Sequence, residues 1–129
     1  MRITILPGPL AVCRLGAGEA FPAWLPARGF VSIARTADEL SIVCAEDAVP
    51  EGVRSERGWR CLAVAGPLDF GMTGVLASIA APLADAGISI FALSTFDTDY
   101  VLVKAEKLDD AAEALRRAGH VVTGDESPA

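Results

Sequence analysis

The chain has 129 residues, of which 52% are hydrophobic, and it carries a formal net charge of −6 at pH 7. This length suits one ordinary domain or two very small ones, and the apolar content is sufficient for a packed core and argues against disorder. The acidic balance is a poor match for a nucleic-acid surface. No apolar run approaches the roughly 20 residues of a membrane span, and prolines, glycine and arginine interrupt residues 1–15 too often for a signal peptide. We therefore expect no nucleic-acid or membrane partner.

The cysteines predict a reducing compartment and no metal site. Cys13, Cys44 and Cys61 are odd in number, and they form neither a CxxC motif nor a paired Cys/His spacing. This pattern is typical of reduced, structural thiols in a cytoplasmic protein. The paired carboxylates of the chain lack a neighbouring histidine or third acid, so we expect no metal and no cofactor.

The first half of the chain is predicted to be rich in strands. Alternating or apolar runs bounded by turn residues indicate four strands, with a hairpin over 30–44. The segment around Pro22–Leu25 is compatible with a short helix or a single helical turn. Residues 45–58 are polar and form the best linker candidate. The predicted strands are residues 2–6, 10–15, 30–35 and 39–44.

The second half is predicted to fold as β-α-β-β-α-β. Val75, Ile79 and Leu83 form one apolar helical stripe, and Asp69 or Thr73 is a candidate N-cap. The predicted elements are a strand at 59–65, a helix at 73–86, strands at 88–94 and 100–104, a helix at 108–118 and a strand at 120–123. Two helices on one face of an antiparallel sheet make a ferredoxin-like architecture.

Two residues of this half carry specific expectations. Pro82 lies inside the first helix, where it removes the hydrogen bond to the Ser78 carbonyl and should bend or loosen the helix. His120 is the only histidine and is interpreted as a capping or surface residue. No histidine precedes it, and no cysteine has a partner in the sequence, so a catalytic triad is not indicated.

Three motifs in the second half resemble the ACT domain, a βαββαβ regulatory module that binds amino acids at domain interfaces. The resemblance is closest to the tandem-ACT group, which includes the CASTOR-type arginine sensors and small bacterial proteins. It implies an α+β fold of two ferredoxin-like ACT-type units with antiparallel sheets, the first unit being degenerate. We expect the units at 1–57 and 58–124, followed by a flexible tail at 125–129. The motifs are GPLDFGMTG at 66–74, APLADAGI at 81–88 and LSTFDTDYVLV at 93–103.

The resemblance also implies a ligand site between the turn after the first strand of this unit and the loop after its second strand. The amides of residues 71–73 at the helix start would hold a carboxylate, and Ser94 and Thr95 would accept from an ammonium group. Asp69 and Asp99 would meet a cationic side chain. On residue types alone, a tight turn at Gly71, a helix cap at Asp69 and a turn shaped by Asp97 and Asp99 explain the pattern equally well. The implied ligand-binding residues are Asp69, Phe70, Gly71, Met72, Thr73, Ser94, Thr95, Phe96 and Asp99.

These observations favour a non-enzymatic regulatory module. It would bind a free amino acid, for which the acidic side chains favour a cationic one, and would act as a homodimer whose association depends on the ligand. Two other hypotheses stay open at this point: a protein–protein interaction module without a metabolite, and an enzyme that uses an acid or a thiol.

Overall fold

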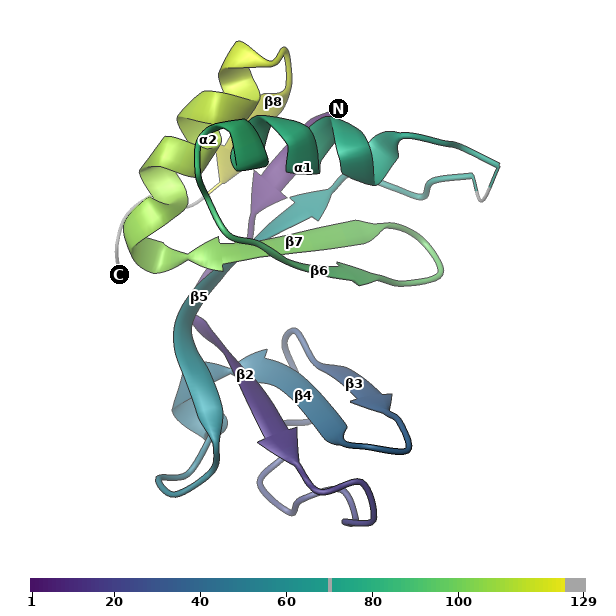
Figure 1. Ribbon diagram of the computed structural model, residues 1–129, viewed down its shortest axis with the longest axis vertical. Helices are drawn as coiled ribbons and strands as arrows, with labels where there is room; N and C mark the ends of the chain where they lie inside the picture. The colour runs from purple at the N-terminus through teal and green to yellow at the C-terminus, as the bar shows by residue number, and fades with distance from the viewer. Residues whose placement is uncertain (70, 125–129) are drawn as a thin grey trace. The chain divides into compact units, whose positions relative to one another are not determined.

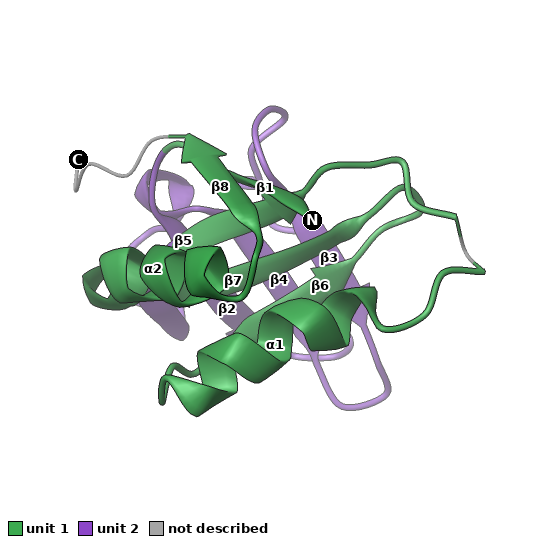
Figure 2. Ribbon diagram, turned by 90° about the horizontal axis from the view of Figure 1, so that it is seen from above, with its two compact units in different colours: residues 1–7, 60–129 green, residues 8–59 purple. Residues whose placement is uncertain are grey.

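The computed structural model describes residues 1–69 and 71–124. The chain divides into two compact units, coloured separately in Figure 2. Residues 8–59 form one, which we call the β unit, and residues 1–7 with the chain from residue 60 form the other, which we call the α+β unit. The domain division expected at 57/58 differs from these units mainly in the placement of Met1–Pro7, and the tail expected at 125–129 lies outside the described residues.

The second half of the chain folds in the predicted order. The elements are β5 (Ser55–Val64), α1 (Val75–Asp85), β6 (Phe91–Ser94), β7 (Asp99–Lys104), a 3₁₀ turn (Ala105–Lys107), α2 (Leu108–Arg117) and β8 (Val121–Gly124). Figure 1 shows α1 and α2 on one face of the sheet of this unit. The predicted α+β, ferredoxin-like class is therefore confirmed for this half. Within the described residues, neither helix is long and apolar enough to cross a membrane.

The sheet of the α+β unit contains a fifth strand from the beginning of the chain. β1 (Arg2–Ile5) lies between β5, to which it is antiparallel, and β8, to which it is parallel. Its alternating pattern buries Ile3 and Ile5 in the core of this unit. Gly124 faces Ile5 so closely that a Cβ there would lie 2.5 Å from the Ile5 carbonyl oxygen. The strand order in this unit is β6-β7-β5-β1-β8.

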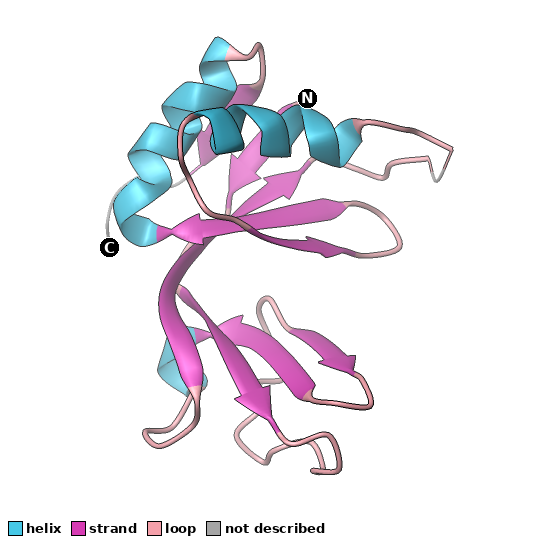
Figure 3. Cartoon of the chain, in the orientation of Figure 1, coloured by secondary structure: helices cyan, strands magenta, loops and turns pink. Residues whose placement is uncertain are grey.

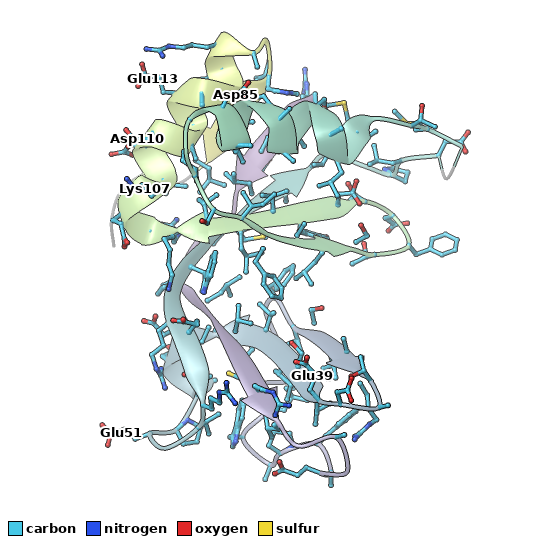
Figure 4. The ribbon with its side chains drawn as sticks, in the orientation of Figure 1. Glu39, Glu51, Asp85, Lys107, Asp110 and Glu113 are labelled. Carbon is cyan, nitrogen blue, oxygen red and sulfur yellow. The ribbon has the colours of Figure 1, made fainter. Side chains whose placement is uncertain are left out.

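The core of the α+β unit lies between the two helices and the sheet. Ile79 and Leu83 of α1, both buried, are the predicted apolar stripe, and Ala111 and Leu115 of α2 complete the helical side. The charged side chains labelled on α2 in Figure 4 point away from the sheet. The sheet contributes Ile3, Ile5, Leu62, Val64, Val101, Val103 and Val122.

His120 supplies the hydrogen bond that Pro82 removes from helix α1. Pro82 has no N–H to give the Ser78 carbonyl, and the His120 Nε2 atom lies 2.8 Å from that carbonyl oxygen. Because a carbonyl only accepts, Nε2 carries the proton. His120 is only 9% exposed, so its interpretation as a surface residue was wrong.

The β unit contains four antiparallel strands in the order β3-β4-β2-β5 and no α-helix among residues 8–59; the short cyan segment of this unit in Figure 3 is a 3₁₀ turn. It therefore lacks both helices of a ferredoxin-like unit. Pro22–Leu25 form a turn, closed by the Leu25 N–H and the Pro22 carbonyl, and part of the expected linker belongs to β5. The elements are β2 (Leu10–Leu15), β3 (Ser32–Arg35), β4 (Leu40–Ala45), a 3₁₀ turn (Glu46–Ala48) and the first part of β5.

The hydrogen bond from His120 to the Ser78 carbonyl predicts that substitutions of Pro82 and His120 have non-additive effects on the free energy of unfolding. His120→Ala should lower the free energy of unfolding by about 1 kcal/mol, because the Ser78 carbonyl loses its donor. In a Pro82→Ala background the new N–H at residue 82 satisfies that carbonyl, so the cost of His120→Ala should fall by at least about 0.5 kcal/mol. Urea unfolding of the four proteins measures this coupling.

The matched control is Arg117→Ala, at an exposed position on α2 whose side chain forms an ion pair with Glu113. This change should move stability by less than about 0.5 kcal/mol. Additive effects of Pro82→Ala and His120→Ala would contradict the assigned hydrogen bond.

Candidate functional site

A cavity of about 230 Å³ lies in the α+β unit, where the β5–α1 connection meets the β6–β7 turn. This is the region that the sequence predicted. Six of the nine predicted residues line it, namely Asp69, Met72, Ser94, Thr95, Phe96 and Asp99. The lining also includes Leu68, Val75, Asp97 and Thr98. These four were missed, and of them only Asp97 carried a sequence signal, as one of a carboxylate pair.

Two hydrogen bonds hold the walls of the cavity together. The buried Thr98 hydroxyl donates to the Val64 carbonyl at 2.7 Å, and the Leu68 N–H donates to the Asp97 carbonyl at 2.6 Å. The walls approach closely at Gly66, where a Cβ would lie 3.0 Å from both the Asp97 carbonyl oxygen and the Thr98 Cβ. The β6–β7 turn is therefore fixed against the end of β5.

Two carboxylates of the cavity are each held in place by a hydrogen bond to one of their two oxygen atoms. Asp99 Oδ1 accepts from the Ser94 hydroxyl at 2.6 Å, and Asp69 Oδ1 accepts from the Gly71 N–H at 2.8 Å. Ser94 and Asp99 are register partners across the β6–β7 hairpin, which explains why their side chains meet. Neither Oδ2 atom has a hydrogen-bond partner among the described residues. Each carboxylate thus retains an acceptor that a ligand can use.

The turn before α1 differs from its predicted role. The Gly71 N–H is bound to Asp69 Oδ1 and the Met72 N–H to the Asp69 carbonyl, so these two amides are occupied. The N-cap of α1 is Gly74, with φ 76° and no capping side chain, so the expected capping by Asp69 or Thr73 was wrong. Thr73 is exposed and does not line the cavity, and Phe70 lies outside the described residues.

The helix start lies beside the cavity nevertheless. Val75, the first residue of α1, is part of the lining. The first N–H groups of a helix have no partner within the helix and attract negative charge. A carboxylate in this cavity would therefore meet the amides that follow Gly74 rather than those of Gly71 and Met72.

The lining is acidic on one side and apolar at its rim. Its charged residues are Asp69, Asp97 and Asp99, and no lysine, arginine or histidine accompanies them. Met72 and Phe96 are large apolar side chains of this lining and are 48% and 79% exposed. The combination suits a small molecule that carries a cationic group on an aliphatic chain.

Metal and thiol chemistry find little support in the described part of the chain. It contains no group of three histidine, cysteine, aspartate or glutamate side chains arranged to hold a metal ion. Burial raises the pKa of the Cys61 thiol to about 12, and burial followed by the neighbouring Cys13 raises the pKa of Cys44 to about 11. Burial also raises the pKa of Cys13. A thiol nucleophile needs a lowered pKa, so these cysteines are structural.

Comparison with known proteins identifies the fold. A family model of the ACT domain matches residues 54–117, and a second model, described as an N-terminal domain, matches residues 8–52. The chain belongs to the ACT domain family. A crystal structure of protein Atu0741 from Agrobacterium tumefaciens is 45% identical, covers 98% of this chain and 94% of that one, and has a TM-score of 0.91.

Two further proteins resemble part of this chain or its fold. The human cytosolic arginine sensor for mTORC1 subunit 1 is 42% identical over 60 residues, which are 46% of this chain and 18% of the sensor. This chain thus matches only a small part of that relative. The regulatory subunit of aspartate kinase from Thermus flavus has a TM-score of 0.65 at 12% identity, covering 91% of this chain and 96% of that one, which shows a shared fold.

The anchoring of the β6–β7 turn makes a stability prediction. Thr98→Val should lower the free energy of unfolding by about 1–3 kcal/mol, because the Val64 carbonyl loses its donor in a buried position. Thr98→Ser keeps the hydroxyl and loses one methyl group, so it should cost only about 1 kcal/mol or less. Urea unfolding compares the two variants, and equal losses would show that the hydroxyl is not what fastens the turn.

Proposed function

We propose that this ACT protein is a regulatory module that binds a free amino acid with a cationic side chain in the cavity of its α+β unit. The observation that carries the proposal is the pair of fixed carboxylates, Asp69 and Asp99, each with one oxygen held by the chain and one available. They line a cavity whose charged residues are all acidic. An ammonium or guanidinium group is the chemistry that complements them.

The remaining groups of an amino acid find complementary atoms in the same cavity. An α-carboxylate fits the amides at the start of α1, which follow Gly74. An α-ammonium fits the hydroxyl oxygens of Ser94 and Thr95, because both hydroxyl protons are already donated, to Asp99 and to the Thr98 carbonyl. The volume of about 230 Å³ lies below the roughly 300–1,000 Å³ of pockets for drug-sized ligands, which favours a single amino acid.

The ligand would act through association. β6 is an edge strand of its sheet within the α+β unit, and Phe96, next to its end, is 79% exposed. A second copy of the chain that covered this rim would exclude water from the ligand and strengthen the charge pairing. Binding then shifts the equilibrium between free and associated chains. We place this activity in the cytoplasm, which agrees with three buried, unpaired cysteines.

The exposed Phe96 and Met72 also favour a second candidate, a protein interaction module that binds no metabolite. The two candidates make opposite predictions for the same variants. Under the interaction module, Phe96→Ser would abolish association and Asp99→Asn would be silent. Under the amino-acid module, Asp99→Asn would remove the response to the ligand.

A thermal-shift panel of the twenty amino acids tests the proposed function. An amino acid present at about 100 times its Kd adds about 2.7 kcal/mol to the free energy of unfolding, which raises Tm by several degrees for a chain of this size. We expect a shift with arginine or lysine and none with their neutral counterparts. Asp69→Asn or Asp99→Asn should weaken the binding at least about tenfold in calorimetry, since each removes a charged hydrogen bond.

The matched control is Asp85→Asn, at an exposed position at the end of α1 outside the cavity (Figure 4). It should bind like the unchanged protein. Light scattering with and without the ligand then measures association. A flat panel, or binding that survives both cavity substitutions, would contradict the proposed site.

A further inference from the structure

The β unit contains a cavity of its own, of about 450 Å³, with a charge opposite to that of the first. All of its lining lies between Arg14 and Arg54, so it belongs to this unit alone. Its charged residues are Arg14, Arg54 and Glu19, and the rest of its lining is largely apolar. Two arginines and one glutamate therefore share this lining in a chain that is acidic overall.

The two arginines oppose each other across neighbouring strands. Cys13 and Ser55 are register partners of β2 and β5, and one step further the Arg14 N–H donates to the Arg54 carbonyl at 2.9 Å. Like charges directly opposite each other on a sheet destabilise it. The Arg14 Nη2 atom donates to the Asp38 carbonyl at 3.0 Å, and among residues 1–69 and 71–124 neither guanidinium forms an ion pair with a carboxylate. The pair is an arrangement that an anion would stabilise.

Glu19 lines the same cavity but forms no ion pair with either arginine among the described residues. Its Oε2 atom accepts from the Gly16 N–H. The loop that carries it is fixed by Arg35, whose Nη2 donates to the Glu19 carbonyl at 2.9 Å and whose Nη1 donates to the Ala17 carbonyl. The guanidinium of Arg35 also lies over the Phe21 ring, 5.5 Å from its centre. The wall of the cavity is thus built by contacts within the β unit.

An aromatic surface completes the site. Trp24 is half-buried, packs against the core of the β unit and lines the cavity together with Pro22 and Val53. A flat ring can pack on an indole, while a carboxylate forms paired hydrogen bonds with a guanidinium. An indole surface and two arginines therefore line the same cavity.

We propose that the cavity of the β unit binds a small aromatic carboxylate, with the carboxylate between Arg14 and Arg54 and the ring against Trp24. A ligand with an additional α-ammonium group is disfavoured there, because that group would lie beside two guanidinium groups. The site is therefore distinct in ligand chemistry from the acidic cavity of the α+β unit, and it does not depend on the function proposed for that cavity.

Titration calorimetry of the full chain with three related compounds tests this site. 3-Phenylpropionate carries the ring and the carboxylate, 3-phenylpropanamide carries the ring without the charge, and phenylalanine adds the α-ammonium group. We expect 3-phenylpropionate to bind with a Kd of about 1 mM or lower and the other two at least about tenfold more weakly. Quenching of tryptophan fluorescence should accompany binding and disappear in Trp24→Phe, because Trp59 is buried.

Substitutions assign the binding to the paired arginines. Arg14→Gln and Arg54→Gln should each weaken 3-phenylpropionate binding about tenfold, because each removes a charge-assisted hydrogen bond. Without ligand, Arg54→Gln should leave Tm unchanged or raise it at low salt, since the opposed charges are relieved. The control is Arg28→Gln, which is exposed, belongs to the same unit and does not line the cavity.

Four results would overturn the proposal. The first is no heat and no quenching with 3-phenylpropionate at millimolar concentration. The second is equal binding of 3-phenylpropanamide, which would leave an apolar depression without a role for the arginines. The third is equal binding of inorganic phosphate, which would make the site a general anion site without a role for Trp24. Undiminished binding to both arginine variants would equally contradict it.

Discussion

The candidate site depends on the hydrogen bond from the buried Thr98 hydroxyl to the carbonyl of Val64. Val64 ends β5, and Thr98 lies in the turn between β6 and β7, so this bond fixes one wall of the cavity against the other. The hydrogen bond from the Leu68 N–H to the Asp97 carbonyl makes a second connection between the same two walls. Because both walls are held, Asp69 and Asp99 keep fixed positions, and fixed carboxylates lose less entropy when they bind a cation than mobile ones do.

The order of elements could be predicted from the sequence, but the membership of β1 could not. Apolar periodicity marked the first helix and the strands of the second half, and Gly87 and Gly119 follow their helices in left-handed conformations. β1 reads as a short strand in either unit, because alternation shows which face is buried and not which sheet is joined. The role of His120 was equally hidden, since its partner, the Ser78 carbonyl, is 42 residues away in the chain.

Six of the nine residues predicted from the sequence line one cavity, while the hydrogen bonds of the backbone groups beside it differ from those expected. Acidic and hydroxyl residues at two turns indicated where they meet. The helix start was placed two residues early, so the amides of Gly71 and Met72 were assigned to a ligand although the Asp69 turn uses them. Hydrogen bonds within a turn depend on backbone angles that residue types leave open. The arginine pair of the β unit was missed because its residues are 40 positions apart and become neighbours only through the pairing of β2 and β5.

Amide chemical-shift mapping with arginine tests the central claim most directly, namely that the acidic cavity of this ACT protein binds a cationic amino acid. In a titration of the labelled full chain, the account predicts shifts concentrated at residues 68–76 and 94–99, with little change in the β unit. Shifts that avoid both segments, or a spectrum unchanged by arginine and by lysine at millimolar concentration, would contradict the account.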